Sequence, residues 1–488
     1  MVFSDLLFIF VFLPLFIISY IIGGWIDNCR KNKATDSGLK LHRPMLWRNL
    51  FLVIFSLIFY SWGEPVYILL MIFSVIINYI SGLIIAKESG KWKKAALVIG
   101  VACDLAILGS FKYLGFFCGS LASIGFPIPV PQIALPIGIS FYIFQSISYL
   151  VDVYRGNSPV QKNFFDLLLY IAMFPQLIAG PIVRYDTVAR EINQRSASAQ
   201  DIAEGVYRFT IGLFKKVVFA NILGEIATQL LAGDITNLSM AGAWVGIIAF
   251  SLQIYFDFSG YSDMAIGMGR SLGFHFNENF DHPYTATSIT NFWRKWHMSL
   301  GSFFRDYVYI PMGGNRRHQV LNIMTVWFLT GMWHGASWNF IFWGLYFGLI
   351  IFVEKYTLLK WNIPRVLSHI YALFVVIVSF GLFYFDDLGR MGEFYRAFFG
   401  MNAPQGLPLD VETVLSDNFW LWVAAIVFCL PIRPFVAKKL DKFAANANGN
   451  TAVYTLYIGR ALIALTILVV CASLLVGATN NAFIYTRF

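Results

Sequence analysis

Residues 321–354 read LNIMTVWFLTGMWHGASWNFIFWGLYFGLIIFVE, an apolar stretch that is broken near its centre by the segment WHGAS at 333–337. Since lipid offers no partner for backbone N–H and C=O groups, the apolar residues on each side of the break predict two half-length helices. Two such helices that meet at a polar break form a re-entrant pattern, which is tolerated only inside protein or beside a water-filled cavity. The stretch therefore predicts a cavity at membrane depth.

The rest of the chain has the composition of a membrane protein. Hydrophobic residues make up 58% of the 488 residues, charged residues make up 13%, and the mean hydropathy is +0.65. We predict an all-α, polytopic integral membrane protein, with about 11 transmembrane helices of about 18 residues or more and additional re-entrant helices. The first apolar run, residues 3–25, lacks a basic start and a small-residue cleavage site, so we expect a retained helix rather than a signal peptide.

Cysteine and charge patterns argue against other classes. The five cysteines are scattered without a CxxC pair, so they suggest neither a disulfide framework nor a zinc or other metal site. The net charge of +9 could indicate nucleic-acid binding, but the basic residues form short clusters beside the apolar runs. That pattern follows the positive-inside rule and orients a chain in the membrane, so we expect no nucleic-acid partner.

Charge clusters also predict the orientation of the chain. The acidic segment 386–417 and the uncharged, Gly/Pro-rich segment 118–132 are expected outside, and the basic clusters are expected in the cytoplasm, at residues 28–48, 87–94, 155–162, 355–365 and 433–442. This alternation places both termini outside the cytoplasm of a bacterial inner membrane. We expect one membrane domain over 1–488, with N-terminal helices at 1–155, a core with re-entrant segments at 156–354, and C-terminal helices and an external tail at 355–488.

Two of the seven histidines lie where a titratable side chain is costly. His297 stands in a basic and aromatic segment, and His334 stands at the helix break. The alternative to function is a neutral imidazole that makes one hydrogen bond in a packed bundle, but such a histidine needs no exposed backbone beside it. The break therefore favours function. The others lie in or beside polar or interfacial segments: His42, His275, His282, His318 and His369.

An imidazole at His334 could take the proton from a hydroxyl as that hydroxyl attacks a thioester carbonyl. Backbone N–H groups of the following helix could hold the oxyanion, while His297 could orient His334 or contact the acyl donor. Nearby basic residues suit the phosphates of coenzyme A, although a basic cytoplasmic loop needs no ligand. These residues are Arg294, Lys295, Arg305, Arg316 and Arg317.

Further polar side chains interrupt the apolar stretch at residues 253–263. They could line the cavity. Asp257 and Asp263 could equally pair with Arg184 or Arg294 and hold helices together, and we favour this structural role for both carboxylates.

Six motifs, taken together and in this order, resemble the membrane-bound O-acyltransferases, in the branch that contains alginate O-acetyltransferase and the peptidoglycan O-acetylation proteins. They are LIFYSWG (57–63), LPIGISF (135–141), FPQLIAGPIVRY (174–185), YFDFSGYSD (255–263), FWRKWH (292–297) and WHG (333–335). The resemblance covers nearly the whole chain. It implies tilted helices around a central funnel, which acetyl-CoA enters from the cytoplasm and the acceptor enters from outside.

The resemblance also implies roles for individual residues. His334 is the expected catalytic histidine, and His297 is its support. The tail FIYTRF (483–488) resembles an aromatic C-terminal motif of the same branch, which implies that Tyr485 carries the acyl group transiently; the alternative is an interfacial aromatic anchor. Donor-binding or funnel residues are expected to be Asn291, Arg294, Lys295, Trp296, Arg305, Trp333 and Ser337.

We therefore expect an acyltransferase that moves an acyl group, with acetyl favoured, from acetyl-CoA as a substrate and without a bound cofactor. The expected acceptor is a cell-envelope or exported polysaccharide of the peptidoglycan, alginate or cellulose type, reached through a separate outer-face acetyltransferase. Lipid acylation and D-alanyl transfer are alternatives within the family. A proton-coupled transporter that uses His334 is a third alternative, which the lack of an inverted repeat disfavours.

Overall fold

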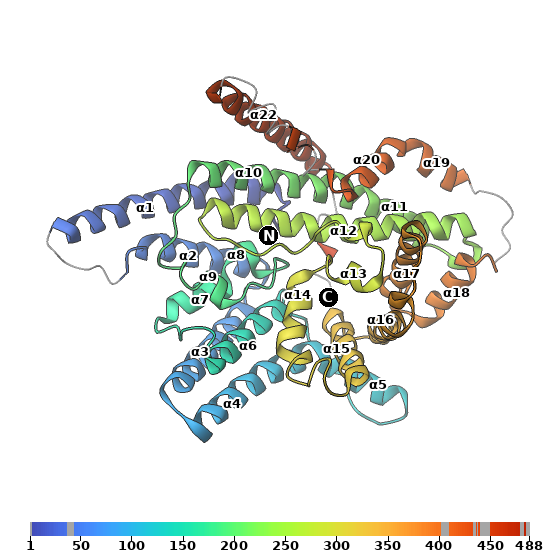
Figure 1. The fold of residues 1–488 in the computed structure, drawn as a ribbon, viewed down its shortest axis with the longest axis horizontal. Coiled ribbons are helices and arrows are strands. Elements are labelled where there is room, and N and C mark those ends of the chain that lie inside the picture. Colours follow the sequence, from blue (N-terminus) through green and yellow to red (C-terminus); the bar gives the residue numbers. More distant parts are fainter. Residues whose placement is uncertain are drawn as a thin grey trace. The chain divides into compact units, whose positions relative to one another are not determined.

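The computed structural model describes residues 2–36, 43–401, 409–432, 436, 438–439, 449–478 and 483–484. Throughout these ranges every regular element is a helix, which confirms the all-α prediction (Figure 1). Eight described helices are long and apolar enough to cross a membrane, or nine if the bent pair α19 (Leu409–Asp417) and α20 (Phe419–Cys429) forms one span. We expected about 11. Some helices are shorter and enclosed by protein, such as α6 (Ile139–Arg155), whose residues are almost all buried.

The chain forms two compact units, and the first comprises residues up to 209 together with 261–277 and part of the tail. It contains most of α10 (Ala199–Phe214) and the end of α12 (Met240–Ser271). Its other helices are η1 (Phe8–Phe12), α1 (Leu13–Asp36), α2 (Leu46–Gly63), α3 (Tyr67–Lys87), α4 (Gly90–Leu108), η2 (Gly109–Tyr113), α5 (Leu114–Ser123), α6, α7 (Phe164–Ala172), α8 (Phe174–Leu177) and α9 (Tyr185–Val188).

Small residues bring the helices of the first unit close together. A Cβ on Gly24 of α1 would lie 2.6 Å from Arg48 Nε of α2, and a Cβ on Gly82 of α3 would lie 2.7 Å from the Tyr149 hydroxyl of α6. Helix α4 packs against both α3 and α6, and the three lie side by side in Figure 1. Small residues at such crossings are typical of membrane helices, where close packing replaces hydrophobic burial as the force that joins them.

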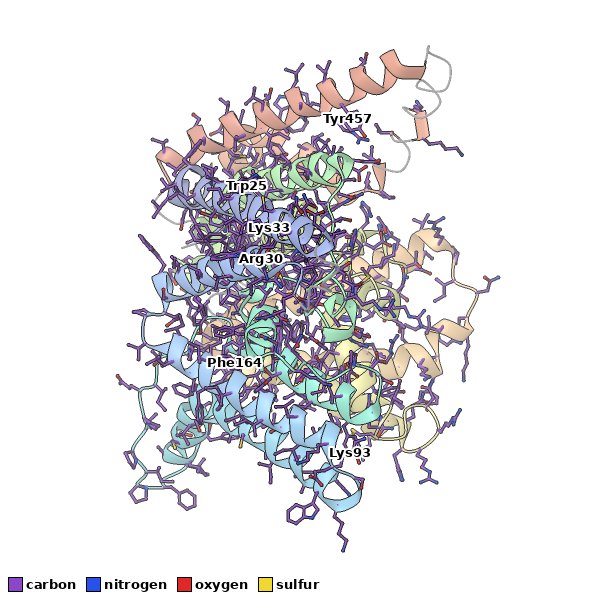
Figure 2. The ribbon with its side chains drawn as sticks, turned by 90° about the vertical axis from the view of Figure 1, so that its left-hand side faces the viewer. Trp25, Arg30, Lys33, Lys93, Phe164 and Tyr457 are labelled. Carbon is purple, nitrogen blue, oxygen red and sulfur yellow. The ribbon has the colours of Figure 1, made fainter. Side chains whose placement is uncertain are left out.

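The outer faces of these helices are apolar. Trp25 of α1 is 69% exposed and Trp62 of α2 is 61% exposed. Figure 2 shows Trp25, Arg30 and Lys33 along α1, and Lys93 on the first turn of α4. Large apolar side chains that point away from the protein are stable in lipid, and basic side chains near helix ends reach the interface. The chain is a multi-pass membrane protein.

Residues 164–184 form an interrupted helical segment. Helix α7 ends at Ala172, the four-residue α8 follows, and the chain then runs without helix to α9. The segment is buried, including Gln176, whose Nε2 donates to the Tyr170 carbonyl oxygen at 2.6 Å. This is irregular backbone enclosed by protein, one of the two settings in which a membrane tolerates it.

The second unit comprises residues 210–260 and 278–480. The first part of α12 belongs to it, together with α19 and α20. Its other helices are η3 (Lys215–Ala220), α11 (Asn221–Leu231), η4 (Ile235–Asn237), η5 (Pro283–Thr285), α13 (Ile289–Trp293), α14 (Met298–Phe304), η6 (Arg305–Tyr309), α15 (Gln319–His334), α16 (Trp338–Tyr356), η7 (Leu358–Lys360), α17 (Arg365–Tyr384), α18 (Leu388–Phe398) and α22 (Gly449–Val476).

Helices α15 and α16 lie on either side of the break in the stretch 321–354. They run antiparallel, because the backbone at Gly331 packs against Gly344, and Met324, further back in α15, packs against Gly348, further along α16. Lys355 Nζ donates to Asn315 Oδ1 at 3.1 Å, so both flanks of the pair meet. The break is confirmed at 335–337. The prediction of two half-length helices is wrong for α16, whose 19 residues are enough to cross a membrane.

Candidate active site

His334 is the last residue of α15, and its side chain is 2% exposed. Its Nδ1 lies 2.7 Å from the carbonyl oxygen of Thr330, one turn earlier in the same helix. A carbonyl oxygen only accepts hydrogen bonds, so Nδ1 carries the proton and Nε2 is the basic nitrogen of the ring. The helix that ends at His334 therefore also fixes the tautomer and orientation of its imidazole.

Aromatic side chains from α16 and α17 enclose this imidazole. The Trp343 ring lies 4.8 Å from the His334 ring between centroids, and the Phe383 ring lies at 5.5 Å; both meet it edge-on. The indole N–H of Trp343 is buried and has no hydrogen-bond partner among the described residues. A proton acceptor and an unused N–H donor thus share one apolar environment, where electrostatic interactions are strong.

The break itself depends on Gly335. Its backbone is extended, with φ near −174°, a conformation that any residue can adopt. A Cβ at this position would collide with the ring of Phe340, so glycine is required for close approach rather than for backbone freedom. The next helix begins after Ser337, whose hydroxyl bonds to Asn339 and does not cap the first turn of α16. The first turn of α16, which follows His334, therefore has backbone N–H groups that are not capped by a side chain.

His297 is the second buried imidazole, with 2% exposure. It lies directly before α14 in the left-handed region, with φ of 43°, where residues other than glycine are uncommon. Its Nδ1 lies 3.1 Å from Asn279 Oδ1. The same oxygen is 3.3 Å from the Ser299 backbone N–H, which can only donate, so Oδ1 is an acceptor and Nδ1 of His297 carries the proton.

A loop holds His297 in this conformation. The backbone N–H of Met298 donates to the Asn279 carbonyl oxygen at 3.0 Å, and the N–H of Asp281 donates to the Lys295 carbonyl oxygen at 2.9 Å. Asn279 itself is fully buried. Backbone strain persists where the surrounding structure fixes the conformation in this way.

The structure brings the two histidines together across Trp333. The Trp333 ring is 5.4 Å from the ring of His297 and 5.0 Å from that of His334 between centroids. The two imidazoles lie close enough to interact electrostatically. Residues that are 37 positions apart in the sequence, at 297 and 334, thus form one buried pair inside the second unit.

Glu354 anchors the helix that leads to His297. Its buried carboxylate accepts from the backbone N–H of Ile289 at 2.5 Å and from the N–H and hydroxyl of Thr290 at 2.8 and 2.6 Å. These groups form the first turn of α13, where a negative charge also complements the helix dipole. The far end of α16 thereby fixes the position of α13, and α13 leads directly into the His297 segment.

The predicted donor-binding residues fall into two groups. Trp296 and Trp333 are buried in the aromatic interior, and Asn291 and Ser337 are half-buried beside it. Arg294 is exposed. Lys295 is half-buried, and its Nζ donates to the hydroxyl of Thr285 at 3.0 Å. Arg305 is exposed and pairs with its neighbour Asp306 at 2.7 Å, which offsets the charge that a phosphate would use. Of the five basic residues that the sequence singled out, Arg294, Arg316 and Arg317 are exposed and have no ion pair with a described residue.

The carboxylates of 253–263 form ion pairs between helices. Asp257 lies 2.6 Å from Lys216 in the second unit, with both side chains almost fully buried, and Asp263 lies 2.9 Å from Arg208 in the first unit. The structural role that we favoured for these carboxylates is thus supported. The cations that hold them are Lys216 and Arg208, which the sequence did not single out.

The predicted acyl carrier Tyr485 lies outside the described residues. Two positions earlier, Phe483 is buried and packs edge-on against Tyr261 of the first unit, at 4.9 Å between ring centroids. No group of three or more His, Cys, Asp or Glu side chains that could hold a metal ion is found in the ranges that the structure describes.

Three residues of the site could not have been found as motifs. Asn279 and Glu354 act through backbone groups and a neighbouring imidazole, and Trp343 is one of 14 tryptophans in the chain. The one available signal was a carboxylate at the end of an apolar helix, since Glu354 closes the stretch 321–354. A buried acidic residue there needs partners, and the structure shows them on α13.

The fold and the site define a polytopic helical membrane protein that buries two imidazoles with fixed tautomers beside a helix break. Residues 158–388 match the sequence profile of the MBOAT, membrane-bound O-acyltransferase family. The chain belongs to this family and is an O-acyltransferase, which replaces the transporter alternative.

Similar proteins align with most or all of this chain. The chain is 39% identical to the probable alginate O-acetylase AlgI of Azotobacter vinelandii, over 92% of this chain and 88% of the relative. It is 36% identical to the probable alginate O-acetylase AlgI of Pseudomonas putida, over 100% of both chains. It is 35% identical to the peptidoglycan O-acetyltransferase of Helicobacter pylori, over 73% of this chain and 70% of the relative. Relatives with O-acetylation in their names thus include two kinds of acceptor polymer.

Proposed function

We propose that this protein transfers an acetyl group from cytoplasmic acetyl-CoA toward a cell-envelope or exported polysaccharide, with His334 as the general base. The observation that carries the proposal is the buried His334 imidazole, whose Nδ1 is committed to Thr330 so that Nε2 is the basic nitrogen. A titratable side chain in a membrane interior is costly, and for that reason an intramembrane histidine is a candidate functional residue.

The proposed step is an acyl transfer. Nε2 of His334 takes the proton of the acceptor hydroxyl while the hydroxyl oxygen attacks the thioester carbonyl carbon. This attack forms a tetrahedral oxyanion. The carbon–sulfur bond then breaks, and the imidazolium returns the proton to the coenzyme A thiolate. General base catalysis of this kind contributes about 10²- to 10⁴-fold to a rate.

Two groups beside His334 could stabilise the oxyanion. One is the uncapped N-terminus of α16, and the other is the indole N–H of Trp343, which has no hydrogen-bond partner in the described part of the chain. Donors that are already oriented in an apolar site stabilise developing charge without reorganisation. His297, held by Asn279, supports the first imidazole, and Arg294 and Lys295 bind the donor phosphates. Asn291, Trp296, Trp333 and Ser337 line the path of the donor.

The surroundings of the site complete the proposal. The chain lies in a bacterial inner membrane and acts there as one membrane domain with a central funnel. Its charge clusters favour an orientation with both termini outside. Tyr485 accepts the acetyl group and passes it to an outer-face acetyltransferase, which modifies the polymer. The buried Phe483 supports this idea, because it holds the start of the tail within the protein.

A deletion strain tests the physiological part of this proposal. Mass spectrometry of its wall material and exopolysaccharide should show loss of O-acetyl groups from one polymer. The intact gene should restore them, and His334→Ala should not. Acetylation that is unchanged by the deletion, or restored by His334→Ala, would reject the assignment.

A second complementation separates the carrier from the base. Tyr485→Phe keeps the aromatic ring but removes the hydroxyl that would accept the acetyl group. We expect loss of polymer acetylation in this strain while the purified variant still hydrolyses acetyl-CoA. Normal polymer acetylation with Tyr485→Phe would show that the tail is an anchor only.

A further inference from the structure

Helices α2, α3, α4 and α6 of the first unit enclose a polar cluster that the acyl transfer does not use. At its centre is Asp104 of α4, which is fully buried. Its Oδ1 accepts from Asn78 Nδ2 at 2.9 Å and from the Ser74 hydroxyl at 3.1 Å, both on α3. A carboxylate in the middle of a transmembrane helix is a candidate functional group.

The cluster contains six oxygen atoms that are buried and have no hydrogen-bond partner among the described residues. They belong to Asp104 Oδ2, Asn78 Oδ1, Gln145 Oε1, the Ser146 hydroxyl and the hydroxyls of Tyr60 and Tyr142. Nearly all buried polar atoms in proteins have a partner, so a group of six indicates a bound species.

Contacts and electrostatics place these atoms in one region of the unit. Tyr142, Gln145 and Ser146 are spaced by three and four positions on α6, which packs against α3 and α4. The Tyr142 hydroxyl interacts electrostatically with Tyr60 and Asp104. Asn78 reaches Asp104 directly. The oxygens therefore come from α3 and from three helices that pack against it, α2, α4 and α6.

Asp104 has no ion pair with a described residue. The nearest buried cation along the chain is Lys112 on η2, which continues α4. It lies two helical turns after Asp104 and donates to the Ser140 hydroxyl at 3.1 Å. An uncompensated carboxylate in a membrane interior is strongly unfavourable. A single positive charge would neutralise it, whereas a divalent ion would leave a net charge in the interior.

We propose that this cluster binds one Na⁺ ion between α2, α3, α4 and α6. One carboxylate balances its charge, and amide and hydroxyl oxygens fill its small coordination shell. K⁺ takes a larger shell and suits six protein oxygens less well. The bound ion joins four helices of the first unit, so its main effect is on the stability of that unit.

Thermal unfolding of the purified full chain in neutral detergent tests this site. The midpoint is measured in NaCl, KCl and choline chloride at equal ionic strength. A ligand that binds only the folded state raises stability with its concentration, so we expect a rise in midpoint that is largest in Na⁺. Asp104→Asn should abolish the difference between Na⁺ and choline. Equal midpoints in all three salts, or a full Na⁺ response in Asp104→Asn, would overturn the proposal.

Two further variants keep the test decisive. Tyr142→Phe removes one oxygen and keeps the ring, so the half-maximal Na⁺ concentration should rise by about tenfold even if Asp104→Asn does not fold. Asp27→Asn is the matched control, since Asp27 is also buried in the first unit but accepts from the backbone N–H groups of Trp47 and Arg48, each at 3.1 Å. It should lose stability and keep the Na⁺ response. A Tyr142→Phe response identical to that of the unmodified protein would contradict the coordination.

Discussion

Replacing Asn279 by leucine removes the acceptor that orients His297 and keeps a side chain of similar size. Asn279 Oδ1 accepts from His297 Nδ1 at 3.1 Å, from the Ser299 backbone N–H at 3.3 Å and from the Ser299 hydroxyl at 2.9 Å. A buried hydrogen bond contributes about 1 kcal/mol, so three lost bonds lower the free energy of unfolding by about 3 kcal/mol. Polar donors that lose this acceptor in an apolar interior add to the cost.

Activity should fall further than stability explains. Without Asn279 the His297 ring can change tautomer and rotate, and loss of an orienting partner typically costs about 10- to 100-fold. We expect kcat of Asn279→Leu, per folded molecule, to fall by this factor with KM for acetyl-CoA little changed. Acetyl-CoA turnover in detergent gives kcat and KM, and denaturant titration gives the folded fraction.

Asn49→Leu is the matched control for this prediction. Asn49 is also buried, but in the first unit, where its Nδ2 donates to the Ile192 carbonyl oxygen at 2.8 Å and its Oδ1 accepts from Arg195 at 2.7 Å. Its loss should lower stability without a comparable change in kcat. The reasoning is refuted if Asn279→Leu keeps the kcat of the unmodified protein, or if Asn49→Leu lowers kcat equally.

Three further substitutions test the supports of the site. Glu354→Gln places an NH₂ group against backbone donors of α13 and should lower the free energy of unfolding by about 2 kcal/mol in denaturant titration; an unchanged midpoint would exclude the anchoring role. Gly335→Ala should fold but lose most acyl transfer, because its Cβ displaces the Phe340 ring beside His334, and normal turnover would show that the break tolerates a side chain. Lys216→Met should cost about 3–5 kcal/mol because it removes the cation that balances a buried carboxylate, whereas the double variant with Asp257→Leu should cost less; additive losses in this cycle would contradict the ion pair.

Helices and the break were predictable because membrane physics acts on local sequence. An apolar run must satisfy its own backbone, so the apolar residues of α2 and α3 form helices. The polar break was visible for the same reason, and His334 was identified from it. The sequence did not reveal that α16 is long enough to cross alone, because the helix continues past the charged residues Glu354 and Lys355 to Tyr356.

Contacts between distant segments were not predictable from one sequence. Asp257 binds Lys216, 41 positions away, and Glu354 binds the backbone of Thr290, 64 positions away. The sequence showed that buried charges need partners but could not choose among them. Asn279 was missed for a related reason, since an asparagine in a polar loop is ordinary until the fold places His297 against it.

The proposed acyl transfer depends most directly on the basic nitrogen of His334. The decisive measurement is acetyl-CoA turnover by the purified protein in which His334 is replaced by glutamine, compared with His369→Gln. His369 also donates from Nδ1 to a backbone carbonyl oxygen, that of Ala286 at 2.9 Å, but lies outside the buried pair. We predict that His334→Gln lowers turnover by about 10²- to 10⁴-fold and that His369→Gln retains it. Turnover by folded His334→Gln at the rate of the unmodified protein would contradict the central claim.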